Sequence, residues 1–179
     1  MIDHIVSPRS MKDIRRIVKE IKELLGIDGL LKVPVLFIFE TVLPEMFPDY
    51  RFQVVPKDEL SKGQYAYTSH QEKVVKIRED VYEEAYAGIP RALFTIAHEL
   101  GHFFMHEGEG YAFSRLEVTV PAYMRAEWQA NYFAAEFLMS SDLILNMSVD
   151  EITKNCNSSA ESASIHLQHA RKEHEKGRL

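Results

Sequence analysis

The sequence has little of what marks several common protein classes. It contains one cysteine, Cys156, which excludes an internal disulfide scaffold and a cysteine-rich structural zinc site. Residues 1–16 carry an acid and a histidine early and no apolar core stretch, so we expect no signal peptide. The longest apolar run, 33–39, is interrupted by Pro34 and is too short to span a bilayer. We therefore expect a cytoplasmic protein with no membrane partner.

Basic residues are not in surplus either. The chain has 21 Lys and Arg against 27 Asp and Glu, a net charge of −6, which speaks against a nucleic-acid partner. Hydrophobic residues make up 46% of the 179 residues, enough to build a core and too many for a disordered chain. This length suggests one main domain, which we place at 1–147, followed by a C-terminal helical appendage at 148–179.

The first half of the chain predicts helices followed by a small sheet. Apolar residues recur at helical spacing over 10–25, with Ser10 and Asp13 arranged as a helix cap and Gly26 placed to end the helix. Pro34 suits the first turn of a second helix, although a buried strand would fit the same periodicity. Short segments rich in Val, Tyr and Phe predict a three-stranded antiparallel sheet, with strands at 50–55, 64–69 and 74–77.

The second half predicts helices on either side of a loop at 107–121, namely at 89–106, 122–139, from 141, at 149–155 and at 159–175. The first of these contains the sequence HELGH at 98–102. Two histidines four residues apart lie on one face of a helix, so His98 and His102 can reach the same ion. Glu99 lies beside the first ligand, where its carboxylate can act as a general base without binding the metal. Gly101 weakens the helix interior, which indicates that another element packs closely against it.

A third ligand must come from elsewhere in the chain. His106 lies eight residues from His98, roughly 12 Å along the helix axis, so both cannot bind one ion. The metzincin pattern is absent, because Met105 and Gly108 stand where that pattern needs Gly and His. We expect a His2Glu site completed from the next helix.

Two glutamates on that helix, Glu127 and Glu136, point to opposite faces. Glu127 shares its face with small and apolar residues, where an unpaired carboxylate is costly, so it is the better ligand. Glu136 fits a solvated position. Asn131, one turn after Glu127, is expected to orient a ligand. His106 and Tyr111 are candidates for stabilising an oxyanion.

The segments RALFTIAHELGHFFMH at 91–106 and EWQANYFAAEFLM at 127–139 together resemble the ImmA/IrrE family of bacterial metallopeptidases. The resemblance is strong over about 74–139 and implies that His98, His102 and Glu127 bind zinc while Glu99 is the catalytic base. Ser140 follows Met139 where the family often has Pro, which affects only the end of this helix. We thus expect an α+β fold, in which the small sheet packs on a zincin-like helical core with a C-terminal helical tail.

The resemblance further implies the biological role. Family members are often encoded in mobile elements or stress-response systems, and several make a specific cut in a helix-turn-helix repressor. We expect a zinc-dependent endopeptidase, or one using another divalent metal such as Mn2+, whose substrate is a bacterial regulatory protein. Three other interpretations compete with it: a non-catalytic metal-containing binding or sensor module, DNA binding through the C-terminal helices, and a peptidase of broad specificity.

Overall fold

The structure is a computed structural model that describes residues 4–109 and 120–177. Helix α1 (Met11–Leu24) begins at Ser10, whose side chain accepts a hydrogen bond from the Asp13 backbone while the Asp13 carboxylate accepts one from Ser10. This capping box confirms the expected start of the helix. A second helical segment follows as α2 (Val35–Phe37), a π-helical turn (Ile38–Val42) and α3 (Leu43–Met46). The choice of helix over strand from Pro34 onward is therefore correct.

Three strands form the sheet, namely β1 (Arg51–Val55), β2 (Ala66–Ser69) and β3 (Val74–Arg78), in the order β1-β3-β2. The α+β class is confirmed, but the sheet is mixed rather than antiparallel. β2 and β3 form an antiparallel hairpin, whereas β1 pairs with β3 in parallel. Four of the five β3 residues are buried, against one of five in β1, so burial of β3 favours its central position.

Helix α4 (Glu79–Tyr86) has no counterpart in the elements expected from the sequence. It follows β3 directly and buries only Val81 and Ala85, one turn apart. Two apolar positions in eight residues make too weak a pattern to predict a helix, and packing on α5 and the sheet accounts for it instead.

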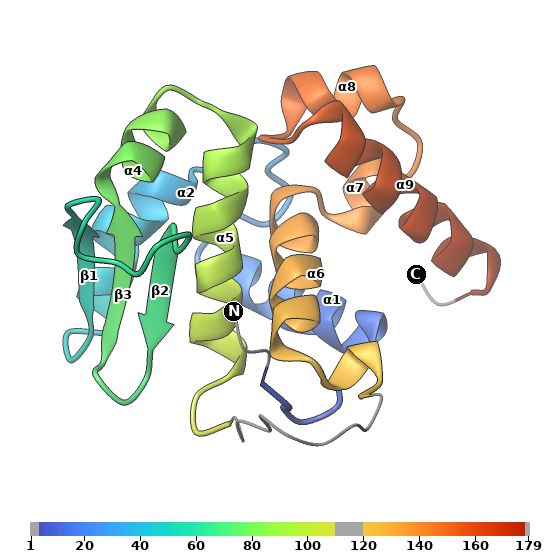
Figure 1. The fold of residues 1–179 in the computed structure, drawn as a ribbon. Coiled ribbons are helices and arrows are strands. Elements are labelled where there is room, and N and C mark those ends of the chain that lie inside the picture. The colour runs from blue at the N-terminus through green and yellow to red at the C-terminus, as the bar shows by residue number, and fades with distance from the viewer. Residues whose placement is uncertain (1–3, 110–119, 178–179) are drawn as a thin grey trace.

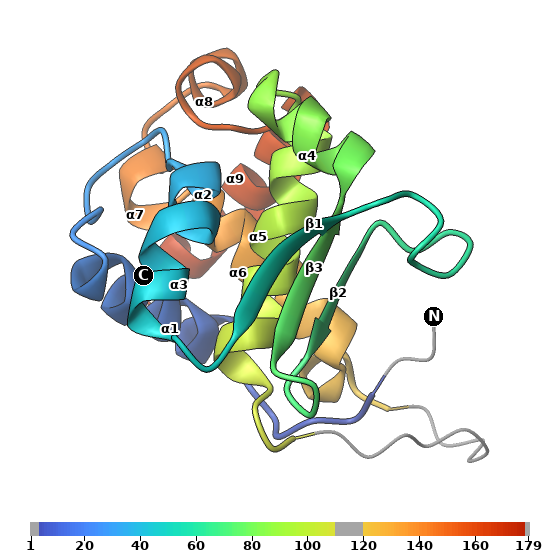
Figure 2. The same ribbon diagram turned by 90° about the vertical axis from the view of Figure 1, so that its left-hand side faces the viewer.

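The centre of the molecule is helix α5 (Pro90–Met105), which carries the HELGH sequence. Figure 1 shows α5 between the sheet on one side and α6 (Ala126–Leu138) on the other, and Figure 2 shows the sheet lying across it. α5 contacts β2 and β3, and its most extensive packing is against α6. β2 and α6, each about 30 residues from α5 in sequence, are thereby brought into contact with it.

The C-terminal part consists of α7 (Ser141–Ile144), α8 (Val149–Asn155) and α9 (Ala160–Glu175), with α9 packed on α6 and α7 (Figure 1). The expected helices are present, while the division between residues 147 and 148 stays a prediction. No helix in the described residues is long and apolar enough to cross a membrane.

The position of Glu136 differs from the solvated one expected from the sequence. It is buried rather than solvated: its carboxylate accepts hydrogen bonds from the backbone N–H and the hydroxyl of Ser141, at 2.9 and 2.6 Å, and lies 3.2 Å from His166 Nε2. A buried carboxylate is tolerated when it is paired in this way. These contacts tie α6 to α7 and α9, so Glu136 joins the C-terminal helices to the rest of the core.

Candidate metal centre

Helix α5 presents His98 and His102 on the same face, one turn apart. Their Nε2 atoms lie 3.0 Å from each other, and both side chains are largely buried. The helix starts at Pro90, which suits the first helical position, and apolar residues bury the opposite side. The local sequence therefore places both imidazoles at the same point.

Helix α6 brings Glu127 to this point. Its two carboxylate oxygens lie 3.4 Å from His98 Nε2 and 3.4 Å from His102 Nε2. One donor atom from each of the three residues lies within 4.8 Å of the others, so the group could hold a metal ion. A tetrahedral ion with bonds of about 2.0–2.1 Å has ligands about 3.3 Å apart. The separation of the two Nε2 atoms, and the distance from each Nε2 atom to its nearer Glu127 oxygen, are close to that figure. Two imidazoles and one carboxylate are also a donor set that suits zinc.

Close packing at Gly101 makes this meeting of helices feasible. A Cβ atom placed on Gly101 would lie 3.1 Å from Ala130 Cα and 3.2 Å from the Ala130 carbonyl oxygen. Phe133 Cδ1 would also be 3.1 Å away. The glycine in the middle of the motif therefore lets the backbone of α6 approach α5, as the sequence predicts.

The electrostatics of the group are coupled. Close contacts with the His102 and His98 imidazoles hold the pKa of Glu127 far below its ordinary range. Burial acts to lower the pKa of His98, but the neighbouring Glu127 and Glu99 carboxylates outweigh it, and the pKa is raised. The Glu127 carboxylate therefore stays ionised beside the two imidazoles. A bound cation needs this negative charge.

Glu99 is buried, at 7% exposure, and lies outside the three-residue group. The hydroxyl of Thr68 on β2 donates a hydrogen bond of 2.7 Å to its Oε2 atom. This contact fixes the carboxylate from the sheet side. Thr68 was not among the residues singled out from the sequence, because a threonine in a short strand carries no signal of a partner 31 residues away.

The Nδ1 atoms of the two histidines have partners of their own. His98 Nδ1 lies 2.9 Å from Asn131 Oδ1, so Asn131 contacts a candidate ligand as expected. His102 Nδ1 lies 3.0 Å from His106 Nδ1, and His106 Nε2 lies 3.1 Å from Gln129 Oε1. Burial lowers the pKa of His106 to about 4, which favours its neutral ring. Sequence reasoning missed Gln129.

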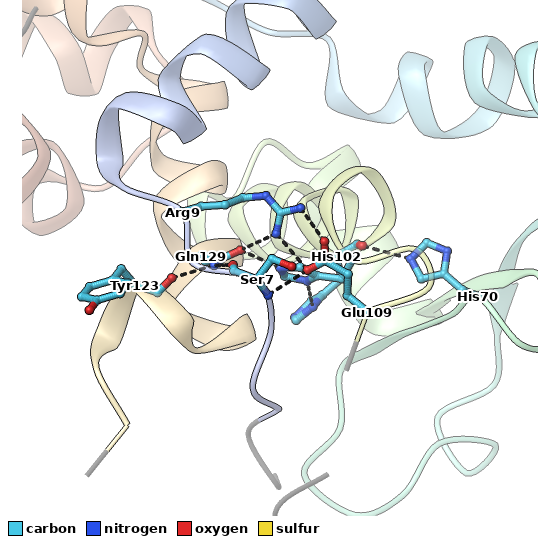
Figure 3. A network of polar contacts seen from close by, with 8 residues as sticks. Ser7, Arg9, His70, His102, Glu109, Tyr123 and Gln129 are labelled. Atoms are coloured by element: carbon cyan, nitrogen blue, oxygen red, sulfur yellow. Dashed lines mark hydrogen bonds and ion pairs between the residues drawn. The ribbon is translucent and has the colours of Figure 1, made fainter. Parts of the chain in front are cut away.

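Further contacts reach this region from the strand side and from the N-terminal segment (Figure 3). His70 Nε2 lies 3.1 Å from the carbonyl oxygen of His102, and Arg9 forms an ion pair of 2.8 Å with Glu109. A cavity of about 680 Å³ borders His102 and Thr68, so the group adjoins a cavity on its His102 side. Tyr111 lies outside the described residues.

Of three comparisons with known proteins, the scan against family models agrees with the resemblance in the sequence. A solved structure described as a Mycobacterium tuberculosis transcriptional regulator is similar to this chain, with 15% identity and a TM-score of 0.46. The match covers 87% of this chain but only 51% of that one. A search of curated proteins finds no significant match. The family model of Peptidase_M78, the IrrE N-terminal-like domain, matches residues 54–167, which include both helices of the candidate metal centre, and the chain thus belongs to this family.

Proposed function

We propose that the protein is a zinc-dependent endopeptidase. The observation that carries the proposal is the convergence of His98, His102 and Glu127 at one point, with the Glu99 carboxylate held beside them by Thr68. In this proposal the first three residues bind the metal and Glu99 is the catalytic base. Membership of a peptidase family supports the same assignment.

The residues then have distinct roles. A bound zinc ion would supply a Lewis acid that polarises the scissile carbonyl and makes water a better nucleophile. Glu99 accepts a proton from the attacking water and passes it to the leaving amine. Thr68 keeps the Glu99 carboxylate oriented for both transfers. His106 contacts His102 and Gln129 through its two ring nitrogens, so we do not assign it to oxyanion stabilisation.

The substrate we propose is a bacterial regulatory protein such as a helix-turn-helix repressor, cut at one place in the cytoplasm. The family resemblance suggests this substrate, and the acidic net charge of −6 favours a protein over a nucleic acid. In the described residues β2 pairs only with β3, which leaves its other edge open to an extended peptide. Thr68 lies on this strand, so such a peptide would run close to Glu99.

Metal content is the first test. Mass spectrometry on the purified wild type should find close to one zinc ion per chain, and Glu127→Ala should lose most of it. Glu83→Ala, which removes an exposed glutamate on α4, is the matched control and should retain the metal. A wild-type chain that takes up no zinc when the metal is added back would contradict the proposal.

Cleavage is the second test. Glu99→Gln should keep the zinc and lose cleavage of repressors encoded near the gene, because the amide cannot accept the proton. A variant that cuts at the wild-type rate would remove Glu99 from this role. Casein should stay intact, and its degradation would favour the peptidase of broad specificity. The non-catalytic sensor module predicts full metal content, no cleavage in the wild type, and unchanged behaviour of Glu99→Gln.

A further inference from the structure

Gln129 is held in a single orientation by two backbone carbonyls. The side chain is fully buried, and its Nε2 atom donates hydrogen bonds of 2.8 Å to the carbonyl oxygens of Ser7 and Tyr123 (Figure 3). Carbonyl oxygens only accept hydrogen bonds, so the NH2 end of the amide must face them. The amide oxygen therefore points the other way, toward His106 and Arg9.

The amide oxygen in turn determines where His106 carries its proton. Gln129 Oε1 lies 3.2 Å from Arg9 Nη1 and 3.1 Å from His106 Nε2. An amide oxygen has no proton to give, so His106 Nε2 must be the donor. In the neutral ring the other nitrogen, Nδ1, then carries a lone pair. His106 Nδ1 can only accept a hydrogen bond from the group it faces.

That group is Nδ1 of His102, 3.0 Å away. His102 must therefore donate through Nδ1, and in its neutral ring this leaves the lone pair on the Nε2 atom. Nε2 is the atom that lies 3.4 Å from Glu127 and 3.0 Å from His98 Nε2. The opposite tautomer would place a proton there and prevent His102 from binding a metal. Each step follows from which atoms can donate.

We propose that Gln129 and His106 are positioning residues that set the tautomer and the ring orientation of His102 for metal binding. This inference rests on the proposed function, in which His102 is a ligand. His98 has a shorter arrangement, in which its Nδ1 atom lies 2.9 Å from Asn131 Oδ1. A ligand whose second nitrogen is bound in this way keeps the metal-binding nitrogen unprotonated and correctly aimed.

The far end of this chain of hydrogen bonds is anchored in the N-terminal segment. The backbone of Val6 and Arg9 donates to the carbonyls of Met124 and Tyr123, and Ala126 donates to the carbonyl of His4. Residues 4–9 therefore lie along the stretch that leads into α6, and they bring Ser7 to Gln129. The protonation pattern of His102 depends on a segment almost a hundred residues earlier in the chain.

The test uses substitutions at His106, because Gln129 is fully buried and its variants would lose the hydrogen bonds to Ser7 and Tyr123 and endanger folding. Zinc affinity of the full chain is measured by competition with a chromogenic chelator. His106→Leu should bind zinc about 10–100-fold more weakly than the wild type. His106→Asn, which offers an oxygen where Nδ1 stands, should recover most of that loss. His70→Leu removes another histidine that contacts His102, through its carbonyl only, and should stay within about twofold of the wild type.

Two results of the affinity measurements would overturn the inference. In the first, His106→Leu binds zinc as tightly as the wild type. In the second, His70→Leu loses as much zinc affinity as His106→Leu. Long-range proton–nitrogen NMR spectra of the metal-free wild type give an independent readout, since they show which ring nitrogen carries the proton. We expect Nε2–H at His106 and Nδ1–H at His102. A proton on His106 Nδ1 would refute the assignment. Failure of the wild type to bind zinc would instead refute the proposed function, while the spectra would still decide the tautomers.

Discussion

Replacing Gly101 by alanine probes the close contact between α5 and α6. Helix propensity alone predicts that the substitution stabilises the protein by about 1 kcal/mol, because alanine is the better helix former. The structure predicts the opposite sign. The added Cβ would lie 3.1 Å from Ala130 Cα and from Phe133 Cδ1, against an optimal carbon–carbon separation of about 3.5–4.0 Å.

The size of the effect follows from what surrounds the new methyl group. Two of its three nearest atoms belong to the backbone at Ala130, which is completely buried and cannot move without shifting α6. Overpacking of a rigid core costs about 1–3 kcal/mol, and we expect the upper part of this range. After subtraction of the helix-propensity gain, Gly101→Ala should destabilise the protein by about 1–2 kcal/mol. For a chain of this length that corresponds to a fall in Tm of roughly 2–8 °C.

Urea unfolding and a chelator competition together measure the two consequences. Because α6 carries Glu127 and α5 carries both histidines, a shift between the helices should also weaken zinc binding. Serine at position 101 adds the same Cβ atom and should behave like alanine or worse. An alanine variant that unfolds at higher urea than the wild type, with zinc affinity unchanged, would refute the reasoning about the helix contact.

Three further substitutions separate the roles of neighbouring residues. Thr68→Val removes the hydroxyl that donates to Glu99, and the loss of a hydrogen bond to a charged group should lower turnover about 10–100-fold. Zinc content should stay full, and Thr68→Ser should restore most of the rate. Asn131→Leu should weaken zinc binding about 10–100-fold in a chelator competition, because it removes the acceptor for His98 Nδ1. Asp80→Asn should destabilise the protein at neutral pH, since hydrogen bonds from the Arg78 guanidinium lower the pKa of Asp80 from 3.8 to about 2. This contribution is present above pH 3.8 and is lost as the pH falls toward 2, so unfolding curves of variant and wild type should converge there; a constant difference would contradict it.

The parts of the fold and the site that could be predicted are those encoded within one element. A repeat of apolar residues together with Ser10 and Asp13 marks α1, and the spacing of His98 and His102 is a property of any helix. Gly101 also allows a prediction from one element. Glycine destabilises a helix interior, so its presence there indicates that another element packs closely against it. These predictions depend on neighbours at most a few residues apart.

Contacts between distant segments were not predictable in the same way. Nothing near Thr68 or Gln129 in the sequence distinguishes them from other polar residues in a strand or a helix. Thr68 acquires its role because β2 packs on α5, and Gln129 acquires its role because residues 4–9 lie beside α6. The parallel pairing of β1 with β3 likewise depends on which strand the core covers. The sequence of one strand does not show which strand will be central.

Glu136 shows how the physical rule and its application can differ. The argument that a carboxylate on an apolar face must be paired selects Glu127, and it applies equally to Glu136 on the other face of α6. Glu136 is not solvated on that face, because Ser141 of α7 and His166 of α9 contact its carboxylate. Both glutamates satisfy the rule with histidine partners: Glu127 lies beside His98 and His102, where the group could hold a metal ion, and Glu136 lies beside His166 in a closed interior contact. Access from the cavity beside His102 distinguishes a candidate ligand from a structural pair, and access is a property of the assembled fold.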